Sequence, residues 1–208
     1  TEILAWREVA GRILQKTPNA GGVIEQFDGF FENPAIQTAK QADVIAIDLV
    51  RPESMTGSLL EANYDYYISR CKHLSSLSEP AYALAACRLG RIEEAYGLFV
   101  TGAQMDLLDH HYCTDKTGHH SACAALVSRV VAEGFCGMRM MEDGIEFEAR
   151  LPQAWKSVEF TIRFRGRCVP VRMTDGQRLS VEIDTGEEQV LTSGHLTPAM
   201  LSADAASA

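Results

Sequence analysis

The pattern of apolar and polar positions divides the sequence into two parts that meet near residue 143. Before that point, apolar residues recur at the spacing of an amphipathic helix. The segments with this spacing are 4–14, 39–50, 59–68, 78–90, 91–108 and 121–134. Ser78 and Pro80 are typical of a helix start, and Gly90 and Gly134 of a helix end. We therefore expect helical hairpins over residues 1–142, either as a small bundle or as part of something larger.

After Gly144 the pattern changes to the alternation of half-buried β-strands. The segments concerned are 145–149, 158–164, 169–173, 179–183 and 188–191. Gly166, Asp175-Gly176 and Thr185-Gly186 supply turns between them. The sequence thus predicts a mainly α chain with a β appendage: a small antiparallel domain over 143–200, followed by a flexible tail over 201–208.

Composition narrows the class of protein. Of the 208 residues, 46% are hydrophobic and 23% are charged, which is ordinary for a globular chain. The formal net charge of -9 and the lack of a basic run argue against nucleic-acid binding. No apolar stretch approaches the roughly 18 residues of a membrane helix. Because the six cysteines are scattered without a CxxC motif, we expect a reducing, cytoplasmic protein without a zinc finger.

Two polar segments precede predicted helices and are candidate anion sites. HLSSLS (73–78) can point hydroxyls, a ring N–H and unpaired backbone amides at an anion. The alternative is a redundant capping sequence in which Ser78 is the cap. TDKTGHHSAC (114–123) places His119 or His120 at the entrance of the next helix, where the alternative is a polar loop with surface histidines.

Other polar residues carry weaker signals. Lys40 and Gln41 precede an apolar helix, and a solvated helix turn is the usual explanation of such a pair. The segment 106–111, with two aspartates and two histidines, could suggest a metal site. Adjacent histidines do not share a helix face, however, so we expect a solvated helix end and no metal. No nucleophile motif of the GxSxG type and no GxxxxGK[ST] loop is present.

Seven segments in order resemble a known family. They are EQFDGFF (25–31), KQADVI (40–45), YDYYISRCKHLSSLS (64–78), AACRLGRIEEAYGLF (85–99), DLLDHHYCTDKTGHHSA (106–122), EGFCGMRM (133–140) and LPQAW (151–155). The family is glycoside hydrolase family 65, which contains inverting phosphorylases of maltose, trehalose, kojibiose and nigerose. The resemblance implies that residues 1–142 are the last helical hairpins of an (α/α)6 barrel. It also implies that 143–200 form a small antiparallel β-sandwich domain.

The resemblance also implies site residues. Those that match the family's phosphate site are Ser75, Ser76, His119 and, less directly, His73; those that match its glucosyl site are Lys40 and Gln41. The general acid, a Glu, would lie upstream, so no catalytic residue is expected in this chain. The implied reaction takes inorganic phosphate as co-substrate and no other cofactor. It converts an α-linked glucose disaccharide into glucose and β-glucose 1-phosphate.

Two functions remain open from the sequence alone. In the first, the chain is the C-terminal portion of a disaccharide phosphorylase, works with a missing N-terminal part, is inactive alone and could form a homodimer. In the second, it is a standalone fragment without catalysis that binds an anion, a sugar or a partner protein. The first predicts an exposed apolar flank where other barrel helices would pack, whereas the second predicts polar outer faces.

Overall fold

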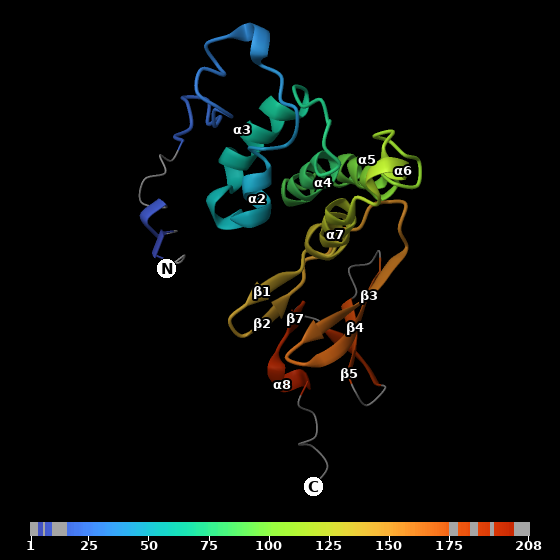
Figure 1. The fold of residues 1–208 in the computed structure, drawn as a ribbon. Helices are drawn as coiled ribbons and strands as arrows, with labels where there is room; N and C mark the ends of the chain where they lie inside the picture. Colours follow the sequence, from blue (N-terminus) through green and yellow to red (C-terminus); the bar gives the residue numbers. More distant parts are fainter. Residues whose placement is uncertain are drawn as a thin grey trace. The chain divides into compact units, whose positions relative to one another are not determined.

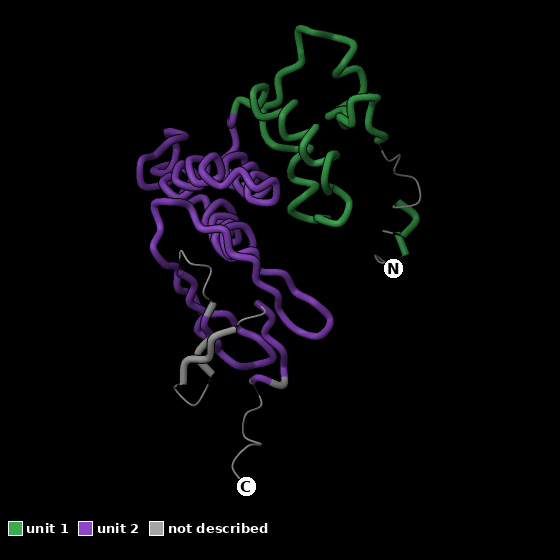
Figure 2. The backbone as a smooth tube through the Cα atoms, turned by 180° about the vertical axis from the view of Figure 1, so that it is seen from behind, with its two compact units in different colours: residues 1–72 green, residues 73–208 purple. Residues whose placement is uncertain are grey.

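The computed structural model describes residues 4–5, 7–9, 16–174, 179–183, 187–191 and 194–201. The chain divides into two compact units, residues 1–72 and 73–208 (Figure 2). The change from helices to strands falls inside the second unit, near residue 139. That residues 1–142 and 143–200 form two separate domains stays a prediction. The predicted helical positions Ile13 and Leu14, the turns at 175–176 and 185–186, and the tail over 202–208 lie outside the described residues.

The first unit contains short helices joined by long connections. Its elements are η1 (Pro34–Ile36), α2 (Ala46–Val50), η2 (Pro52–Ser54) and α3 (Gly57–Ile68). The helix predicted over 39–50 is wrong for 39–45, because Ala39 pairs with Cys71 in a parallel bridge instead. The Ala39 N–H donates to Arg70 O at 3.0 Å, and the Lys72 N–H donates to Ala39 O at 2.8 Å.

A buried asparagine on α3 fixes the loop before η1. The Asn63 amide accepts from the Ile24 N–H at 2.7 Å and donates to Gly22 O at 2.9 Å and Leu59 O at 2.8 Å. The Tyr67 hydroxyl donates to Ile24 O at 2.6 Å. These bonds satisfy backbone groups that would otherwise be buried without partners, so the loop needs no regular secondary structure.

The helices predicted in the second unit are present in the predicted order, and a short unpredicted helix, α6 (Thr114–Thr117), lies among them. The others are α4 (Ser78–Arg88), α5 (Ile92–Ala103), α7 (Ser121–Arg129) and η3 (Val130–Phe135), the last being a π-helix. α5 ends five residues earlier than the predicted Leu108. Within the described residues, no helix is both long enough and apolar enough to cross a membrane.

Two glycines allow these helices to approach closely. A Cβ at Gly102 on α5 would lie 3.3 Å from Pro80 Cδ on α4 and 3.3 Å from Val127 Cγ2 on α7. A Cβ at Gly134 on η3 would lie 2.9 Å from Cys87 Sγ, near the end of α4. Pro80 at the start of α4 thus lies near Val127 late in α7, and Cys87 near the end of α4 lies near Gly134 on η3, so α4 runs parallel to α7 and η3. Figure 1 shows α4, α5 and α7 gathered in one group of helices.

The strands form antiparallel sheets, as predicted, but the first and last of them are not among the predicted strands. They are β1 (Arg139–Met141), β2 (Gly144–Glu146), β3 (Ser157–Phe164), β4 (Arg167–Thr174), β5 (Leu179–Ile183), β6 (Glu187–Leu191) and β7 (His195–Leu196), followed by α8 (Pro198–Leu201). One described sheet has the order β1-β2-β7 and the other β3-β4-β5-β6. Ile145 and Leu196 from the first share one buried cluster with Val171 and Met173 from the second.

Aromatic side chains join the helices to the strand region. The Trp155 ring lies 5.4 Å from that of Phe99 on α5 and 5.0 Å from that of Phe135 on η3. The Gln153 N–H donates to Glu93 Oε1 at 2.8 Å. Both contacts come from the connection that leads into β3, so the second unit includes helices and sheets together.

The close packing at Gly134 gives a first prediction. Gly134→Ala places a methyl group against Cys87, and we expect it to lower the free energy of unfolding by about 1–3 kcal/mol. Gly97→Ala is the matched control, because nothing lies within 4 Å of a Cβ there and α5 gains a better helix former. Urea unfolding followed by circular dichroism measures both, and equal stability of the two variants would contradict the packing argument.

The buried amide gives a second prediction. Asn63→Ala leaves the Ile24 N–H and the Gly22 carbonyl without their side-chain partner, and we expect a loss of about 2 kcal/mol or more. Asn19→Ala is the control, because the Asn19 side chain also accepts backbone N–H groups, from Gly21 and Val23, but is exposed to water. Its cost, measured by the same unfolding experiment, should stay below about 1 kcal/mol.

Candidate functional site

The first turns of α4 and α7 come together at Gly102 on α5. A Cβ at Gly102 would lie 3.3 Å from Pro80 Cδ in the first turn of α4, and Cys123 Sγ–H in the first turn of α7 donates to Gly102 O at 3.5 Å. Burial raises the pKa of the Cys123 thiol to about 11, and the charges of Glu79 on α4 and of Asp106 add to that rise. The two segments that precede these helices, 73–77 and 118–120, therefore end at neighbouring helix starts.

The segment before α4 turns sharply into the helix. His73 has a φ of 49°, and the Ser75 hydroxyl accepts from the Leu77 N–H at 3.4 Å. The helix begins at Ser78 with Leu77 in the cap position and no side-chain cap. The alternative interpretation of Ser78 as the cap is therefore wrong. Ser75 and Ser76 are both half-buried.

Two polar atoms in the first turn of α4 are buried without a hydrogen bond. Ser78 is fully buried and Glu79 is 9% exposed, and neither Ser78 Oγ nor Glu79 Oε2 has a partner among the described residues. The other carboxylate oxygen, Glu79 Oε1, lies 3.8 Å from His73 Nδ1. The His73 ring also packs at 5.4 Å from the ring of Tyr82. Such orphaned polar atoms are uncommon in native proteins and indicate a place where a ligand or water belongs.

The loop between α5 and α7 is organised by two aspartates. Asp109 Oδ1 accepts from the N–H groups of Cys113 at 3.0 Å and Thr114 at 2.9 Å. Asp106 accepts from the His120 N–H at 2.9 Å and pairs with His120 Nδ1 at 2.6 Å. The hydrogen bond from His120 holds the pKa of Asp106 below its usual value, and that from the Thr114 backbone does the same for Asp109.

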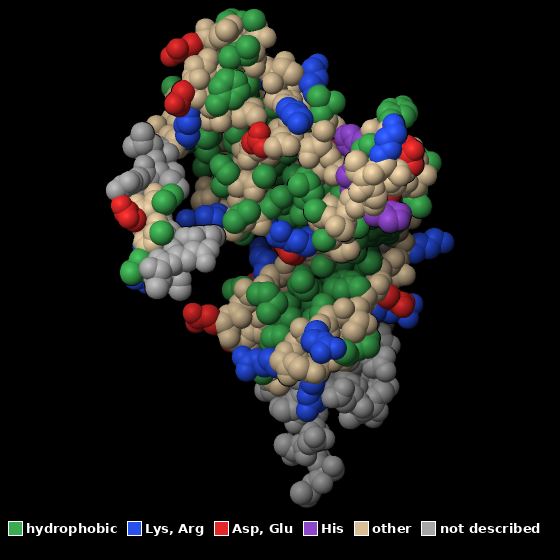
Figure 3. Space-filling view, viewed as in Figure 1, with side chains coloured by type: hydrophobic (Ala, Val, Ile, Leu, Met, Phe, Trp, Pro, Cys, Tyr) green, Lys and Arg blue, Asp and Glu red, His purple; other side chains and the backbone are tan. Residues whose placement is uncertain are grey.

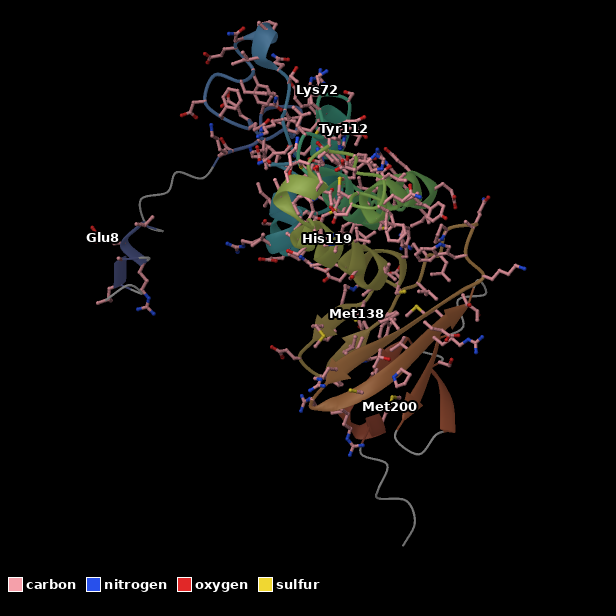
Figure 4. The ribbon with its side chains drawn as sticks, turned by 45° about the vertical axis from the view of Figure 1, so that its right-hand side comes forward. Glu8, Lys72, Tyr112, His119, Met138 and Met200 are labelled. Carbon is pink, nitrogen blue, oxygen red and sulfur yellow. The ribbon has the colours of Figure 1, made fainter. Side chains whose placement is uncertain are left out.

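The two neighbouring histidines of this loop have different roles. The His120 side chain is 21% exposed and is bound to Asp106. The His119 side chain is 87% exposed, with Nδ1 at 3.7 Å from Asp106 Oδ2, so its ring is open to a ligand. Figure 4 labels His119 close to α7. Figure 3 shows histidine side chains at the surface around α6. An exposed imidazole, serine hydroxyls and helix-start amides are each donors of the kind that binds a dianion.

Lys40 and Gln41 lie in the first unit, between the Ala39 bridge and α2. Lys40 is exposed, and the half-buried Gln41 donates through Nε2 to Asp43 Oδ1 at 2.6 Å. Asp43 also accepts from Gln26 Nε2 at 2.7 Å. The predicted solvated helix turn is thus an ordered turn before the helix.

Sequence reasoning missed the function of Asp106 and Asp109. It treated them as a solvated helix end, but both carboxylates hold the loop that carries His119. The signal was a pair of aspartates three residues apart directly before a loop rich in polar residues. In the described part of the chain, no group of three or more His, Cys, Asp or Glu side chains is placed so that it could hold a metal ion.

Two family models match the chain, in consecutive segments. The glycosyl hydrolase family 65 central catalytic domain matches residues 32–128. The glycosyl hydrolase family 65 C-terminal domain matches residues 138–194. The two matches fall on the helical part and on the strand-rich part of the chain.

Similar proteins are phosphorylases. The 1,2-alpha-glucosylglycerol phosphorylase of Bacillus selenitireducens is 29% identical, over 94% of this chain and 31% of its own length. The alpha,alpha-trehalose phosphorylase of Thermoanaerobacter brockii is 31% identical, over 83% of this chain and 25% of its own length. A solved structure assigned as a kojibiose phosphorylase from the human microbiome shares the fold, with a TM-score of 0.72 at 23% identity. The match spans 94% of this chain and 30% of the chain in the solved structure.

The chain therefore spans about a quarter to a third of the length of the relatives it matches. The order of its two matched segments, catalytic domain first and C-terminal domain second, agrees with the resemblance found in its motifs. The chain belongs to glycosyl hydrolase family 65, and what it matches is the C-terminal part of that family's proteins.

Proposed function

We propose that this chain is the C-terminal part of an inverting disaccharide phosphorylase and supplies its phosphate site. In this proposal, residues 1–142 are the last helices of an (α/α)6 catalytic barrel and 143–200 are the small β-sandwich domain that follows it. The matched relatives support a phosphorylase, since those compared above carry that activity in their names. Ser75, Ser76 and His119 would bind phosphate, with His73 beside them.

One observation carries the proposal: two loops with anion-binding side chains lead into helices that start side by side. The α4 loop offers the hydroxyls of Ser75 and Ser76, and the α7 loop offers the exposed ring of His119. The positive ends of both helix dipoles favour an anion at this end. The buried Ser78 Oγ, without a hydrogen bond among the described residues, adds a hydroxyl that a bound ligand or water would satisfy.

The proposed chemistry is a single displacement at the anomeric carbon. A phosphate oxygen forms a bond to that carbon from the face opposite the leaving sugar, while the glycosidic C–O bond breaks. A general acid protonates the departing oxygen, and the product is β-glucose 1-phosphate. The phosphate takes the place of the base and water that an inverting hydrolase uses. The residues of this chain hold and orient the phosphate.

Other parts of the site complete the proposal. Lys40 and Gln41 would contact the glucosyl unit, and the general-acid Glu would belong to the part of the relatives that this chain does not span. Large apolar side chains are exposed around the proposed phosphate loops, namely Leu74, Leu77, Leu107, Leu108 and Tyr112. Such an apolar flank supports packing against further barrel helices rather than a standalone module. A homodimer stays a prediction.

A buried carboxylate favours a second candidate, inverting hydrolysis. Glu79 has one oxygen near His73 and a second, Oε2, that has no partner among the described residues. A carboxylate in that position could activate a water, and its negative charge would oppose a phosphate dianion. The two candidates differ in whether inorganic phosphate is consumed.

Phosphate binding tests the proposed site directly. We expect isothermal titration of the chain with inorganic phosphate to show saturable binding. Replacing the hydroxyls in the double variant Ser75→Ala, Ser76→Ala, or the ring in His119→Asn, should weaken it about tenfold, which corresponds to about 1.4 kcal/mol of lost hydrogen bonding. His110→Asn, an exposed histidine of the same loop, is the control and should bind as the unaltered chain does. If all variants bind alike, the site is not at these loops.

Turnover tests the reaction and the place of the acid. With trehalose, kojibiose or maltose plus phosphate, the 208-residue chain alone should release no β-glucose 1-phosphate, because loss of a general acid typically costs about 10²–10⁴ in rate. Phosphorus NMR and a glucose assay measure the two products. Release of β-glucose 1-phosphate would place the acid within this chain, whereas glucose released without phosphate would favour hydrolysis through Glu79. A reading frame that continues upstream of Thr1 with a candidate Glu would allow the same assay on the longer protein.

A further inference from the structure

The loop between α5 and α7 places a thiol, an imidazole and a carboxylate in a row. Cys113 Sγ lies 3.9 Å from His120 Nε2, and His120 Nδ1 lies 2.6 Å from Asp106 Oδ1. This is the order of a nucleophile, its general base and the carboxylate that orients the base. The proposed phosphate site does not use Cys113.

The hydrogen bonds of Asp106 fix the direction in which a proton can move. Asp106 stays ionised, because the hydrogen bond from His120 holds its pKa below the usual value. An ionised carboxylate only accepts, so the proton of the neutral imidazole lies on Nδ1 and the lone pair on Nε2. The Nε2 lone pair faces Cys113 Sγ and can take the thiol proton.

Cys113 is more accessible to a reagent than the buried cysteines are. It is half-buried, whereas burial raises the pKa of the Cys87 and Cys136 thiols to about 12 and makes them poor nucleophiles. Cys168, on β4, is exposed and lies opposite Arg163 on β3. Cys113 and Cys168 can both be reached by a small reagent, so a comparison between them separates exposure from activation.

We propose that Cys113 is a thiol-modification site, at which a low-molecular-weight disulfide forms a mixed disulfide with the chain. His120 Nε2 takes the proton from Sγ, and the thiolate forms a new S–S bond with one sulfur of the reagent. The reagent's own S–S bond breaks, and the proton on His120 passes to the departing thiolate or, when that thiolate is weakly basic, to water. Asp106 orients the imidazole and stabilises its charged form during the exchange.

The modified residue lies on the loop that carries His119. A group attached to Cys113 would occupy the space between the thiol and His120, whose bonds to Asp106 hold the entrance of α7. We expect phosphate binding to fall when Cys113 carries a mixed disulfide. This consequence rests on the proposed function, whereas the reactivity of the thiol does not.

The rate of disulfide exchange tests the site on the full chain. With dithiobis-nitrobenzoate, an aromatic disulfide that releases a coloured thiolate, we expect one thiol to react about tenfold faster than the next. Cys113→Ser should remove that phase, and Cys168→Ser, the exposed control, should leave it unchanged. Loss of the fast phase from Cys168→Ser instead would overturn the proposal, as would a fast phase that survives Cys113→Ser.

A second variant tests the role of His120. His120→Asn keeps a donor near Asp106 but removes the base, and we expect the fast phase to slow about tenfold and its pH profile to change. His110→Asn is the control and should leave the rate and the profile unchanged. Asp106, Asp109, His111 and His119 lie near the pair, so the pH profile is read as the difference between the two variants. An unchanged rate and profile in a folded His120→Asn chain would refute base catalysis.

Discussion

The absence of a side chain at Gly134 is what allows η3 to lie directly against Cys87 on α4. Gly102 does the same at the other end, where α4, α5 and α7 meet. With a side chain at either position the parallel helices would separate, because packed interiors do not absorb an extra methyl group freely. The ends of segments 73–77 and 118–120, which lead into α4 and α7, would then move apart as well. The arrangement of the candidate site thus depends on packing that lies one or more helical turns away from it.

Parts of this fold could be predicted from the sequence because they depend on local chemistry. Ser78 and Pro80 begin α4, Gly90 follows its end, and alternating side chains mark β3 and β4. The prediction fails over 39–45, because the backbone of Ala39 bonds to residues on either side of Cys71, far along the chain. A helical pattern does not reveal such a distant partner.

The candidate site shows the same limit in its side chains. The sequence indicated the segments around Ser75 and His119 as polar entrances to helices, which is a local property. It did not indicate that Asp106 binds His120 fourteen positions later, or that Glu79 is buried. The first fact depends on how the connection between α5 and α7 folds, and the second on what packs around the start of α4. The arrangement of these side chains therefore follows from the tertiary structure, whereas the phosphate-binding role proposed for the loops came from the family resemblance.

The π-helix η3 has a consequence for how this family can change in length. A π-turn holds one more residue than an α-turn, so it behaves as a single-residue insertion kept within a helix. Removing one residue from Val130–Phe135 would convert the π-turn into an α-turn and leave the later residues nearly in phase, because the wider turn spreads one extra residue over about the same rotation. Phe135 would then still face Phe99 and Trp155, which join the helices to the strands. In an ordinary α-helix such as α5, by contrast, removing one residue would rotate every later residue by about 100°. η3 is thus a place where the chain can lose one residue without changing which side chains reach the strands.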